Sequence, residues 1–502
     1  MIVEMHCHTR EHSSCSRASA ADLVHHAQTA GVQAIIFTDH EYLWTDQEID
    51  QLRATSSLPE HILIMAGQEV RTRDFGDILV YGATESIPRG IDIATLRSRW
   101  PNAALIWAHP YRGNRRPTDE KLLDDHLDGI EIFSSNHDAE ASAHALHDWH
   151  RLGFIAIAGT DAHNPTSSGA YPTVFDNDVQ SMEELVFEIQ AGRCKPYVKE
   201  APASGTSDTN VLEVSIGPRQ SVKQKDIIIK TYKNEEAWAE GERSARIISE
   251  ISQHIGMKEF RVPKPLGAAH DHLALVEERL EGVTLYDHLV SSTIEEAEDA
   301  LKRAARWLAR LHNCRLRITP VDEFMQIEPE RLKWYLSGMR NDNHPHLARA
   351  EKILSHVLEL ERSMFQNEAK HLVQGHGDFH PKNIFIGQDS HGPFAGAIDF
   401  NSSFVLHPAF DVGTFMAQYM NQFYNQTELK KNVPIDVFLE EYYKHSTFIG
   451  PHFMSYALVC KARCCLSIIY YLVKIGLGES ENFWFVLVEA EKSLVHSTIS
   501  RN

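Results

Sequence analysis

Cysteine is scarce in this sequence, and the features of an exported or membrane-bound chain are missing. The seven cysteines among 502 residues are an odd, sparse set. They argue against a disulfide-stapled fold and favour reduced thiols in the cytoplasm. The opening residues, Met1 to His6, have no basic segment followed by a long apolar one, so we expect no signal peptide. No stretch approaches about 18 consecutive apolar residues, so we expect no membrane-spanning helix.

Basic residues are also few relative to acidic ones. Lys and Arg total 49 against 69 Asp and Glu, which gives a formal net charge of −20. This charge argues against binding to duplex DNA or to an anionic membrane. There is no aromatic and basic stripe typical of single-strand binding, so we expect no nucleic-acid partner. Histidine, by contrast, is abundant, with 30 residues against 27 Gly and 20 Pro. Because histidine is the commonest metal ligand, its arrangement along the chain matters.

Length and residue balance indicate a globular protein of two or more domains. Hydrophobic residues make up 43% and charged residues 24% of the chain, an ordinary globular balance, and 502 residues exceed one ordinary core. The small, polar segment 201–210 is typical of a linker. We therefore predict one domain over residues 1–200 and a second over residues 211–502.

The first domain alternates short apolar runs with helical segments, which predicts a mostly parallel α/β sheet. One helix is expected over 19–30, with Ser19 as its N-cap and Gly31 as its stop. Seven strands could close as a barrel. The strand-like runs are 2–6, 34–40, 62–70, 77–82, 103–109, 129–133 and 154–161.

The second domain opens with strand-like runs and then becomes mainly helical. The runs 211–216 and 226–232 precede a long helix over 235–255, and another strand follows over 274–280. Beyond about residue 290 the pattern is helical, except near 372–400. This order predicts a small β-rich lobe followed by a larger helical lobe.

Five of the predicted strands in the first domain end in histidine or carboxylate residues. In a parallel barrel these ends converge on one face, and alternate residues of an extended segment point the same way. Imidazole and carboxylate ligands suit Zn, Mn or Fe. The set exceeds the needs of one tetrahedral ion and indicates a hydrolytic site with more than one ion. The candidate ligands are His6, His8, Asp39, His40, Glu69, His109, Asp161 and His163.

These blocks, HCHT, TDH, GQE, AHP and GTDAH, resemble in order the motifs of the PHP (polymerase and histidinol phosphatase) family. The resemblance covers about residues 1–196. It implies a distorted seven-stranded barrel that binds two or three divalent metals and hydrolyses phosphoesters with a metal-bridging hydroxide. The ligands carried over are those named above, with Asp39 and His40 as alternatives, because Asp39 could instead orient His40.

Several positions depart from that family's pattern. The segment after the first block offers His12, which is either a ligand or a surface residue. A position that is often His in the family corresponds here to Asp77, and His137 follows the sixth strand as a further candidate. Glu4 stands where Asp is common. These departures leave the third metal less defined than the first two.

The second domain contains a constellation suited to phosphoryl transfer. Residues 376–383 read His-Gly-Asp-Phe-His-Pro-Lys-Asn, and residues 398–400 read Ile-Asp-Phe. Asp378 would accept or orient the proton of the acceptor hydroxyl, while Asn383 and Asp399 would hold Mg²⁺ ions that bridge the phosphates of ATP.

Upstream residues complete a nucleotide site. Lys230 ends the run Ile-Ile-Ile-Lys on a predicted strand and could pair with the α- and β-phosphates. Glu242 is the first choice to anchor this lysine, and Glu236 the second. The segment 216–221 is a candidate loop over the phosphates. Glu277 belongs to a strand and hinge, 276–282, whose backbone would receive adenine.

This set resembles the aminoglycoside phosphotransferase and choline kinase-type small-molecule kinases over roughly residues 211–470. The resemblance implies a two-lobed, protein-kinase-like fold that uses ATP and Mg²⁺ and in which Asp411 is structural. A cationic aminoglycoside would suit an acidic acceptor pocket. Acceptor choice is expected in the helical lobe, where the candidate residues are Asp322, Glu323, Glu328, Trp334 and Tyr335.

Together these patterns predict a cytoplasmic bifunctional enzyme. A metal-dependent phosphoesterase that acts on a small-molecule phosphoester would be joined to an ATP-dependent kinase for a hydroxyl-bearing acceptor. The alternative is that one domain alone is catalytic and the other senses a ligand or serves as a scaffold.

Overall fold

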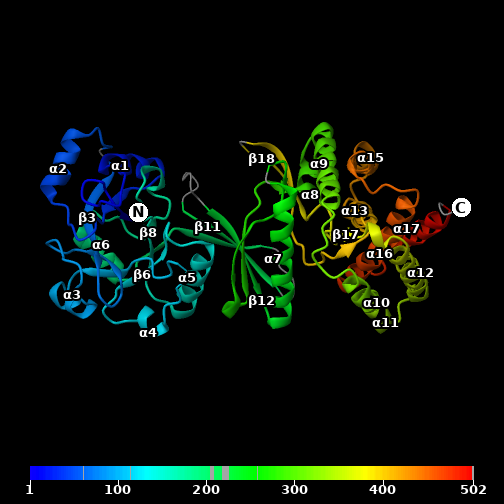
Figure 1. Cartoon of the computed structure of the whole chain (residues 1–502), viewed down its shortest axis with the longest axis horizontal. Coiled ribbons are helices and arrows are strands. Elements are labelled where there is room, and N and C mark those ends of the chain that lie inside the picture. Colours follow the sequence, from blue (N-terminus) through cyan, green and yellow to red (C-terminus); the bar gives the residue numbers. More distant parts are fainter. Residues whose placement is uncertain are drawn as a thin grey trace. The chain divides into compact units, whose positions relative to one another are not determined.

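A computed structural model describes residues 1–59, 61–113, 115–203, 209–217, 225–256, 258–389 and 391–499. The chain forms two compact units, whose elements can be followed by label and colour in Figure 1. Unit 1 comprises Met1–Trp238 and Leu266–Arg279, and unit 2 comprises Ala239–Pro265 and Leu280–Asn502.

Unit 1 contains a nine-stranded sheet in the order β7-β6-β5-β4-β3-β2-β1-β8-β9. Strands β1 to β3 are parallel, as are β5 to β7, while β4 is antiparallel to both of its neighbours. Just beyond β7, Ala162 pairs with Cys7 of β1, which joins the two ends of this seven-strand set into a barrel-like form. The strands are β1 (Ile2–Cys7), β2 (Ala34–Phe37), β3 (Leu63–Arg71), β4 (Asp77–Tyr81), β5 (Ala104–Trp107), β6 (Gly129–Phe133), β7 (Ala156–Ala158), β8 (Thr173–Phe175) and β9 (Cys194–Pro196).

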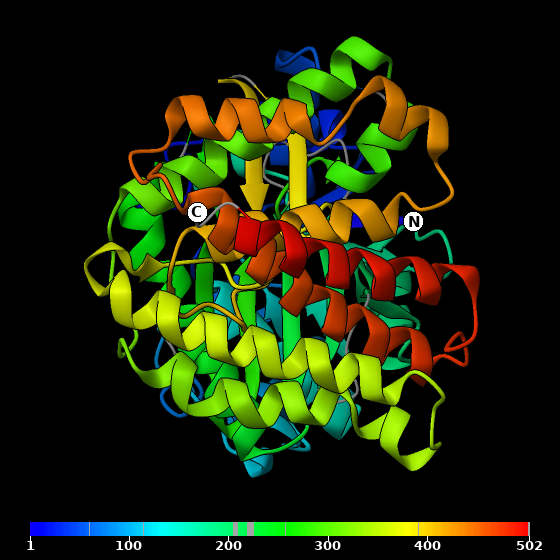
Figure 2. The ribbon, with the colours of Figure 1, turned by 90° about the vertical axis from the view of Figure 1, so that its right-hand side faces the viewer.

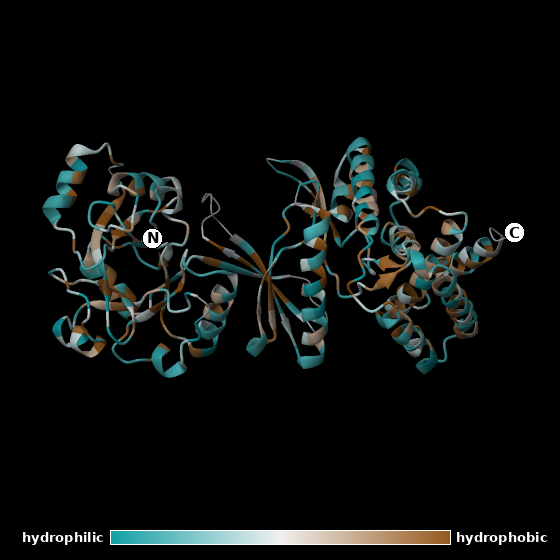
Figure 3. Ribbon diagram, viewed as in Figure 1, coloured by the Kyte–Doolittle hydropathy of each residue, from teal (hydrophilic) through white to brown (hydrophobic). Residues whose placement is uncertain are grey.

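Helices connect these strands, and most begin at a side chain that satisfies a free backbone N–H. Ser19 caps the first helix as expected, and Thr45 forms a capping box with Glu48. The described residues of α2 include no buried side chain, and Figure 3 shows this helix as largely hydrophilic beside the hydrophobic strands. The helices are α1 (Ala20–Thr29), α2 (Asp46–Thr55), α3 (Ile93–Arg99), α4 (Asp119–Leu122), η1 (Pro165–Ser167), α5 (Ala139–Leu152) and α6 (Met182–Gln190).

The seven predicted strands of the barrel are present, with ends shorter by a few residues in most cases. The sequence pattern did not anticipate the antiparallel direction of β4 or the added strands β8 and β9. The buried apolar side chains of the barrel strands pack in the barrel interior and against the helices outside it. This hydrophobic core supports the strand ends that carry the candidate ligands.

A second sheet of five strands, in the order β10-β11-β12-β15-β14, overturns the predicted linker. β10 pairs with β11 from Val198 opposite Ile216 to Ala203 opposite Val211, so residues 201–203 and 209–210 belong to a hairpin. Residues 204–208 lie outside the described residues. The elements are β10 (Val198–Ala203), β11 (Thr209–Ile216), β12 (Lys225–Tyr232), β14 (Pro265–Ala269), η2 (His270–His272) and β15 (Ala274–Glu278).

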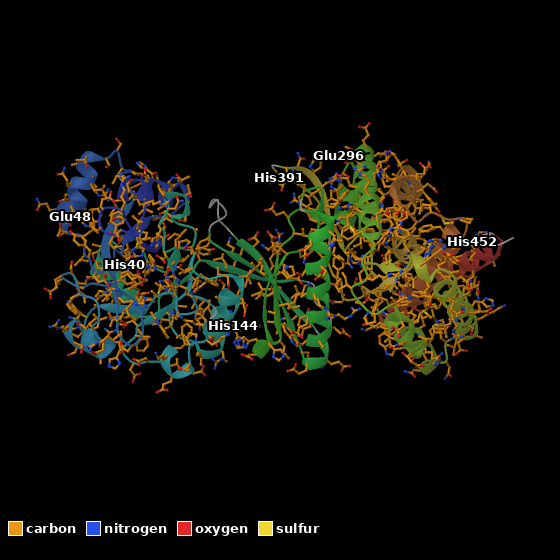
Figure 4. All side chains as sticks on the ribbon, in the orientation of Figure 1. His40, Glu48, His144, Glu296, His391 and His452 are labelled. Carbon is orange, nitrogen blue, oxygen red and sulfur yellow. The ribbon has the colours of Figure 1, made fainter. Side chains whose placement is uncertain are left out.

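This five-stranded sheet shares a hydrophobic core with the barrel. Val214, Ile216 and Val276 belong to the same buried cluster as Ala141 and Ala145 of α5. Figure 4 labels His144 on α5, on the side of the helix that lies toward the sheet. The boundary of unit 1 therefore lies well beyond residue 200, where the sequence pattern had put the end of the first domain.

Unit 2 is mainly helical, with small sheets of four strands (β13-β19-β18-β16) and two strands (β17-β20). Figure 2 shows α12, α16 and α17 lying side by side, and these helices contact one another. The strands are β13 (Phe260–Arg261), β16 (Val283–Thr284), β17 (Val373–Gln374), β18 (Ile384–Asp389), β19 (Gly392–Ala397) and β20 (Val405–Leu406). The helices are α7 (Glu235–Ile255), which begins in unit 1, α8 (Leu285–Ser291), α9 (Ile294–Asn313), α10 (Glu323–Tyr335), α11 (Ser337–Asn341), α12 (Leu347–Asn367), η3 (Ala369–His371), α13 (Ala409–Gln422), α14 (Thr427–Asn432), α15 (Asp436–His445), α16 (Phe453–Lys474) and α17 (Glu481–Ile499).

Helix α16 is long and apolar enough to cross a membrane by length and composition alone, which the sequence pattern did not anticipate. However, 67% of its most apolar 18-residue window is buried inside the protein, as in a core helix. Its cysteines Cys460, Cys464 and Cys465 are buried and unpaired, as expected for core packing.

Candidate active sites

The barrel of unit 1 brings four candidate ligands into one buried cluster. His6, His8, Glu69 and Asp161 each offer a nitrogen or oxygen atom, and these four atoms all lie within 4.8 Å of one another. His8 Nε2 is 2.9 Å from Asp161 Oδ1 and 3.1 Å from Glu69 Oε2. His6 Nε2 is 3.1 Å from His8 Nε2. The four residues come from β1, β3 and the segment after β7, whose ends meet at the same face.

Further ligands lie around this cluster. His40 Nδ1 is 3.0 Å from Glu69 Oε2, and His109 Nε2 is 3.2 Å from Glu69 Oε1. Glu69 is therefore shared between neighbouring groups of ligands. His109 and Asp161 have positive φ values of 31° and 52°, a strained backbone conformation that is common at functional sites.

The electrostatics of the cluster come from imidazoles and carboxylates buried together. Burial acts to lower the pKa of His8, but bonds to and charges of Asp161 and Glu69 outweigh it and raise that pKa to about 9. The pKa of His6 is also well above its ordinary value, because Asp161, Glu131 and Glu69 outweigh the effect of burial. Burial would raise the pKa of Glu69, yet the charge of His6 and bonds from the histidines hold it well below its ordinary value.

The donor set fits divalent metal ions. The oxygen atom Asp161 Oδ1 is buried and makes no hydrogen bond within the described residues, although His8 Nε2 lies only 2.9 Å away. Buried imidazole nitrogens and carboxylate oxygens that gather at one point form a donor set suited to a cation. Imidazole with carboxylate favours Zn, Mn or Fe over Ca or Mg.

Asp39, which the sequence offered as a ligand, has a different role. Its two oxygens accept hydrogen bonds from Thr9 N (2.7 Å), Thr9 Oγ1 (2.7 Å), Ser13 Oγ (2.6 Å) and Trp44 Nε1 (2.7 Å). With its acceptor sites occupied, Asp39 fixes the loop after β1 and belongs to none of the ligand groups found among the described residues. Of the two alternatives, His40 is the one that reaches the cluster, since its Nδ1 lies close to Glu69.

Two buried carboxylates behind the cluster, Glu131 and Glu4, were not identified from the sequence as functional groups. Glu131 Oε1 lies 2.9 Å from His6 Nδ1, and Glu131 Oε2 accepts a hydrogen bond from the His109 backbone N–H at 2.8 Å. Glu4 accepts from the backbone N–H groups of His6, Thr160 and Gly169. The signal for Glu131 was available, since it is the one charged residue in the strand Gly-Ile-Glu-Ile-Phe.

Some of the remaining candidate ligands lie near the cluster, and others lie outside the ligand groups. Cys15, which sequence reasoning missed, joins His8 and His40 in a further ligand group, and its Sγ lies 3.1 Å from His163 Nε2. Asp77 joins Glu69 and His109 in another group but also pairs with Arg71 at 2.8 Å.

His12 and His137 belong to none of the ligand groups found among the described residues. The His12 Nε2 atom pairs with Glu48 Oε1 at 3.2 Å, and the His12 ring stacks on Tyr42. His137 Nδ1 lies 3.1 Å from the backbone oxygen of Ile132, while its buried Nε2 has no hydrogen-bond partner within the described residues.

In unit 2, a hairpin brings the second candidate site together. β18 and β19 pair from Ile384 opposite Ala397, so Asn383 and Ile398 lie side by side at the open end of the hairpin. The Ile398 N–H donates to Asn383 O at 2.9 Å, and Asp399 follows directly. Asn383 Nδ2 donates to the backbone oxygen of Asp378 at 3.1 Å and approaches Asp378 Oδ2 at 3.4 Å.

Asp411 holds the loop that carries Asp378. Its carboxylate accepts hydrogen bonds from the N–H groups of His376 (2.8 Å) and Gly377 (2.7 Å), and His312 Nε2 lies 3.0 Å away. These buried contacts match the structural role expected of Asp411. Gly377 has φ +84°, and a Cβ atom there would lie 1.7 Å from the Ser402 backbone oxygen, so the turn before Asp378 requires glycine.

The Asp378 carboxyl is partly exposed and ionised near neutral pH. About 40% of its side chain is accessible to solvent. Burial acts to raise its pKa, but the nearby positive charges of His380, His376 and Arg463 keep that pKa below its ordinary value. An ionised, accessible carboxylate is what a base for an acceptor hydroxyl requires.

Lys230 has a different ion-pair partner from the one expected. Its Nζ atom lies 2.8 Å from Glu277 Oε2, on the neighbouring strand β15. Glu242, the expected partner, is exposed on α7, as is Glu236. Glu277 thus supplies the partner of Lys230 through its side chain, and the backbone contact of segment 276–282 to adenine stays a prediction. Most of the candidate phosphate loop, residues 218–221, lies outside the described residues.

Comparisons with known proteins identify a phosphotransferase domain. Residues 202–428 match the family described as "Phosphotransferase enzyme family", and residues 145–194 match the family described as "PHP-associated". The first match includes Lys230, Asp378, Asn383 and Asp399. The second is a PHP-associated segment and does not cover the strands that carry His6, His8 and Glu69. No curated protein matches the chain.

The solved structures to which the chain is similar are distant in sequence. An ethanolamine kinase from Plasmodium vivax is 15% identical, with a TM-score of 0.40, covering 60% of this chain and 81% of its own. A choline kinase from Cryptosporidium parvum is 16% identical, with a TM-score of 0.39 and coverages of 61% and 89%. A streptomycin-ATP-APH(2")-IIa ternary complex is 15% identical, with a TM-score of 0.34 and coverages of 59% and 91%.

Proposed function

We propose that this protein is a bifunctional enzyme, an ATP-dependent small-molecule kinase joined to a metal-dependent phosphoesterase. The kinase half is carried by Asp378, Asn383 and Asp399, which meet on one loop and hairpin inside the matched phosphotransferase domain. The phosphoesterase half is carried by the buried cluster of His6, His8, Glu69 and Asp161.

In the kinase reaction, the Asp378 carboxylate orients the acceptor hydroxyl and takes its proton. Asn383 and Asp399 would hold Mg²⁺, and Lys230, braced by Glu277, would contact the phosphates of ATP. Bound Mg²⁺ supplies charge neutralisation on the transferring phosphoryl group. The hydrogen bond from Asn383 to the Asp378 backbone keeps the base and the Mg²⁺-binding residue in fixed relation.

In the phosphoesterase, His6, His8, Glu69 and Asp161 would hold the inner metal ions, with His40 and His109 beside them. Such ions supply Lewis-acid chemistry and lower the pKa of water from about 16 to about 7. Glu131 fixes the ring of His6 through Nδ1 and leaves Nε2 directed at the cluster. Such a centre removes phosphate from a small-molecule ester.

A metabolite screen that records ATP consumption and phosphate release tests both halves. Asp378→Asn should lower kinase turnover by about 100-fold or more and leave phosphate release intact. His6→Ala with His8→Ala should abolish phosphate release and bound transition metal while kinase activity persists. Exposed residues supply the controls, Asp342→Asn and His25→Ala. Full kinase activity in Asp378→Asn, or retained metal in the double histidine variant, contradicts the corresponding half.

The same measurements address the alternative of one silent domain. Metal analysis together with ATP binding on the intact protein distinguishes a protein with two catalytic domains from one in which a single domain is catalytic. Metal without catalysed phosphate release favours a sensing or scaffolding barrel, and ATP binding without transfer favours a silent kinase domain.

A further inference from the structure

A polar cavity of about 240 Å³ lies directly beside Asp378 in unit 2. Its lining includes Arg331, Tyr335, Asp378, Thr414, Arg463 and Tyr470. Because the proposed base forms part of its wall, this is where the acceptor of the kinase reaction would bind. The volume is below the roughly 300–1,000 Å³ of sites for drug-sized ligands, so it suits a small metabolite. Tyr335 is the one residue of the five acceptor candidates from the sequence that lines it.

The wall of this cavity carries two positive charges close together, those of Arg331 and Arg463. Arg463 binds the buried carboxylate of Glu328 through Nε (2.7 Å) and Nη2 (3.1 Å). Arg331 Nε donates to that same carboxylate at 2.9 Å. Two guanidinium groups therefore share the carboxylate of Glu328, and the ionised carboxylate of the wall itself is that of Asp378, the proposed base.

A second acidic residue, Glu361 on α12, lies near this group. It is fully buried, and neither of its carboxyl oxygens has a hydrogen-bond partner within the described residues. Burial, reinforced by the negative charge of Glu328, holds the pKa of Glu361 well above its ordinary value and so favours its uncharged form.

Both arginines are held rigidly and retain free donors. Arg463 projects from the apolar helix α16 with only 7% of its side chain exposed, and its guanidinium lies 5.1 Å from the Phe410 ring centre. Arg331 lies 5.4 Å from the Phe324 ring centre. Each guanidinium has five N–H donors. Arg331 Nη2 also lies 2.8 Å from Glu328 Oε2, so each arginine uses two of its three nitrogens on that carboxylate.

Buried N–H donors are costly to leave without acceptors, and a ligand with oxygen acceptors can complete their pairing. Planar guanidinium groups bind carboxylate and phosphate oxygens in pairs, and they repel ammonium groups. The hydroxyl Thr414 Oγ1, also in the wall, is buried without a hydrogen-bond partner among the described residues. These groups together form a site for a small oxyanion next to the phosphate-transfer base.

We propose that the acceptor of the kinase is a small hydroxyl compound that carries a carboxylate or phosphate group, bound by Arg331 and Arg463. The proposal rests on the kinase activity proposed above and names its substrate class. The acceptor oxygen forms a bond to the γ-phosphorus of ATP, the bond from that phosphorus to the bridging oxygen breaks, and ADP leaves with the electron pair. The hydroxyl proton passes to Asp378. Choline, ethanolamine and aminoglycosides, which are cationic, fall outside this class.

The test measures ADP formation by the full-length protein with Mg²⁺ and ATP on hydroxyl compounds grouped by charge. The set includes glycerate, glycerol 3-phosphate, glycerol, ethanolamine and kanamycin among a wider panel of carboxylates, phosphates, neutral alcohols and amines. The carboxylate and phosphate arms distinguish the two sources of the oxyanion. The variant with His6→Ala and His8→Ala is run in parallel to prevent loss of phosphorylated acceptors. The best acceptors are expected to be anionic and to depend on Asp378.

Arg331→Gln then tests the residue itself, because Arg331 is a quarter exposed and can be replaced without burying a new charge. Its KM for the anionic acceptor should rise about 10- to 100-fold, with a smaller change in kcat and none in the KM for ATP. Arg331→Lys should recover part of the loss. Arg340→Gln, an exposed arginine on α11 that does not line the cavity, is the matched control.

Three outcomes contradict these expectations in different ways. Neutral or cationic compounds as the best acceptors, still dependent on Asp378, overturn the anionic class and leave the kinase proposal standing. An unchanged KM in Arg331→Gln removes that residue from the acceptor site. Absence of any Asp378-dependent ADP formation across the panel overturns both the substrate class and the kinase proposal.

Discussion

Glu131 is a buried side chain placed to tune the proposed metal centre without joining its ligand cluster. It lies 2.9 Å from His6 Nδ1 and also accepts a hydrogen bond from the His109 backbone. Carboxylates in this position fix the ring orientation of a histidine ligand and increase its basicity. We therefore predict that Glu131→Gln lowers the affinity for Zn²⁺ or Mn²⁺ by about 10- to 100-fold, measured by calorimetric titration of the chelator-treated full-length protein.

The exposed Glu183→Gln in the same unit is the control for the loss of one charge. Circular dichroism at matched temperature shows whether the Glu131 variant keeps its fold. Unchanged metal affinity in a folded Glu131→Gln protein would mean that His6 is oriented without this carboxylate.

At the scale of single residues, the sequence named the side chains that the fold gathers into the buried cluster, but not the groups that support them. His6 and His8 stand out because two residues apart on a strand point the same way. The role of Asp39 could not be decided from the sequence, because a carboxylate at a strand end gives the same pattern whether it faces a metal or four hydrogen-bond donors. The partner of Lys230 was missed for a related reason, because Glu277 becomes its neighbour only through the pairing of β12 with β15.

Among the elements, the turn that precedes Asp378 depends most sharply on one residue. A Cβ atom at Gly377 would meet the Ser402 backbone oxygen at 1.7 Å, and φ there is +84°. Gly377→Ala should therefore move the loop and destabilise unit 2 by about 2–3 kcal/mol. Because small displacements of a catalytic group cost about 100-fold in rate, kinase turnover should fall by at least that factor. Denaturant unfolding and ADP formation measure the two effects.

A comparison with Gly392 in the same unit separates the cost of a positive φ from the cost of the steric clash at Gly377. It also has a positive φ, +109°, but a Cβ atom there would have no neighbour within 4 Å. Gly392→Ala should cost only about 1 kcal/mol and leave kinase turnover nearly unchanged. Equal losses in the two alanine variants would show that positive φ alone, and not contact with Ser402, makes Gly377 necessary.

The elements themselves were predictable where their hydrophobic pattern was strong. The seven barrel strands are buried on both faces and appear as continuous apolar runs, but such a run does not encode whether its strand is parallel, so the reversal of β4 was missed. β10 was mistaken for a linker because it contains small residues and Pro202. As an edge strand paired only with β11, it tolerates a proline that an inner strand would not.

For the whole molecule, the division into units differs from the division by motif. The strand with Lys230 belongs to the matched phosphotransferase domain, yet it lies in unit 1 with the barrel. The reason is a shared core, in which Val214, Ile216 and Val276 of the five-stranded sheet are buried with Ala141 of α5. Sequence patterns locate motifs along the chain, but a shared core between distant segments has no local signal.

This shared core predicts the behaviour of a truncated protein. A fragment of residues 1–200 keeps every barrel ligand but loses β11, β12, β14 and β15, which exposes the apolar side chains of α5 that they cover. Each large side chain uncovered costs about 1.5–3 kcal/mol. We therefore expect the fragment to unfold at a lower temperature than the barrel of the full chain and to self-associate through the exposed face. Differential scanning calorimetry and light scattering, with full-length protein as the reference, measure both effects. A monomeric fragment that retains the unfolding temperature and metal affinity of the full chain would show that the barrel is independent of the five-stranded sheet, and that residues near 200 are a true domain boundary after all.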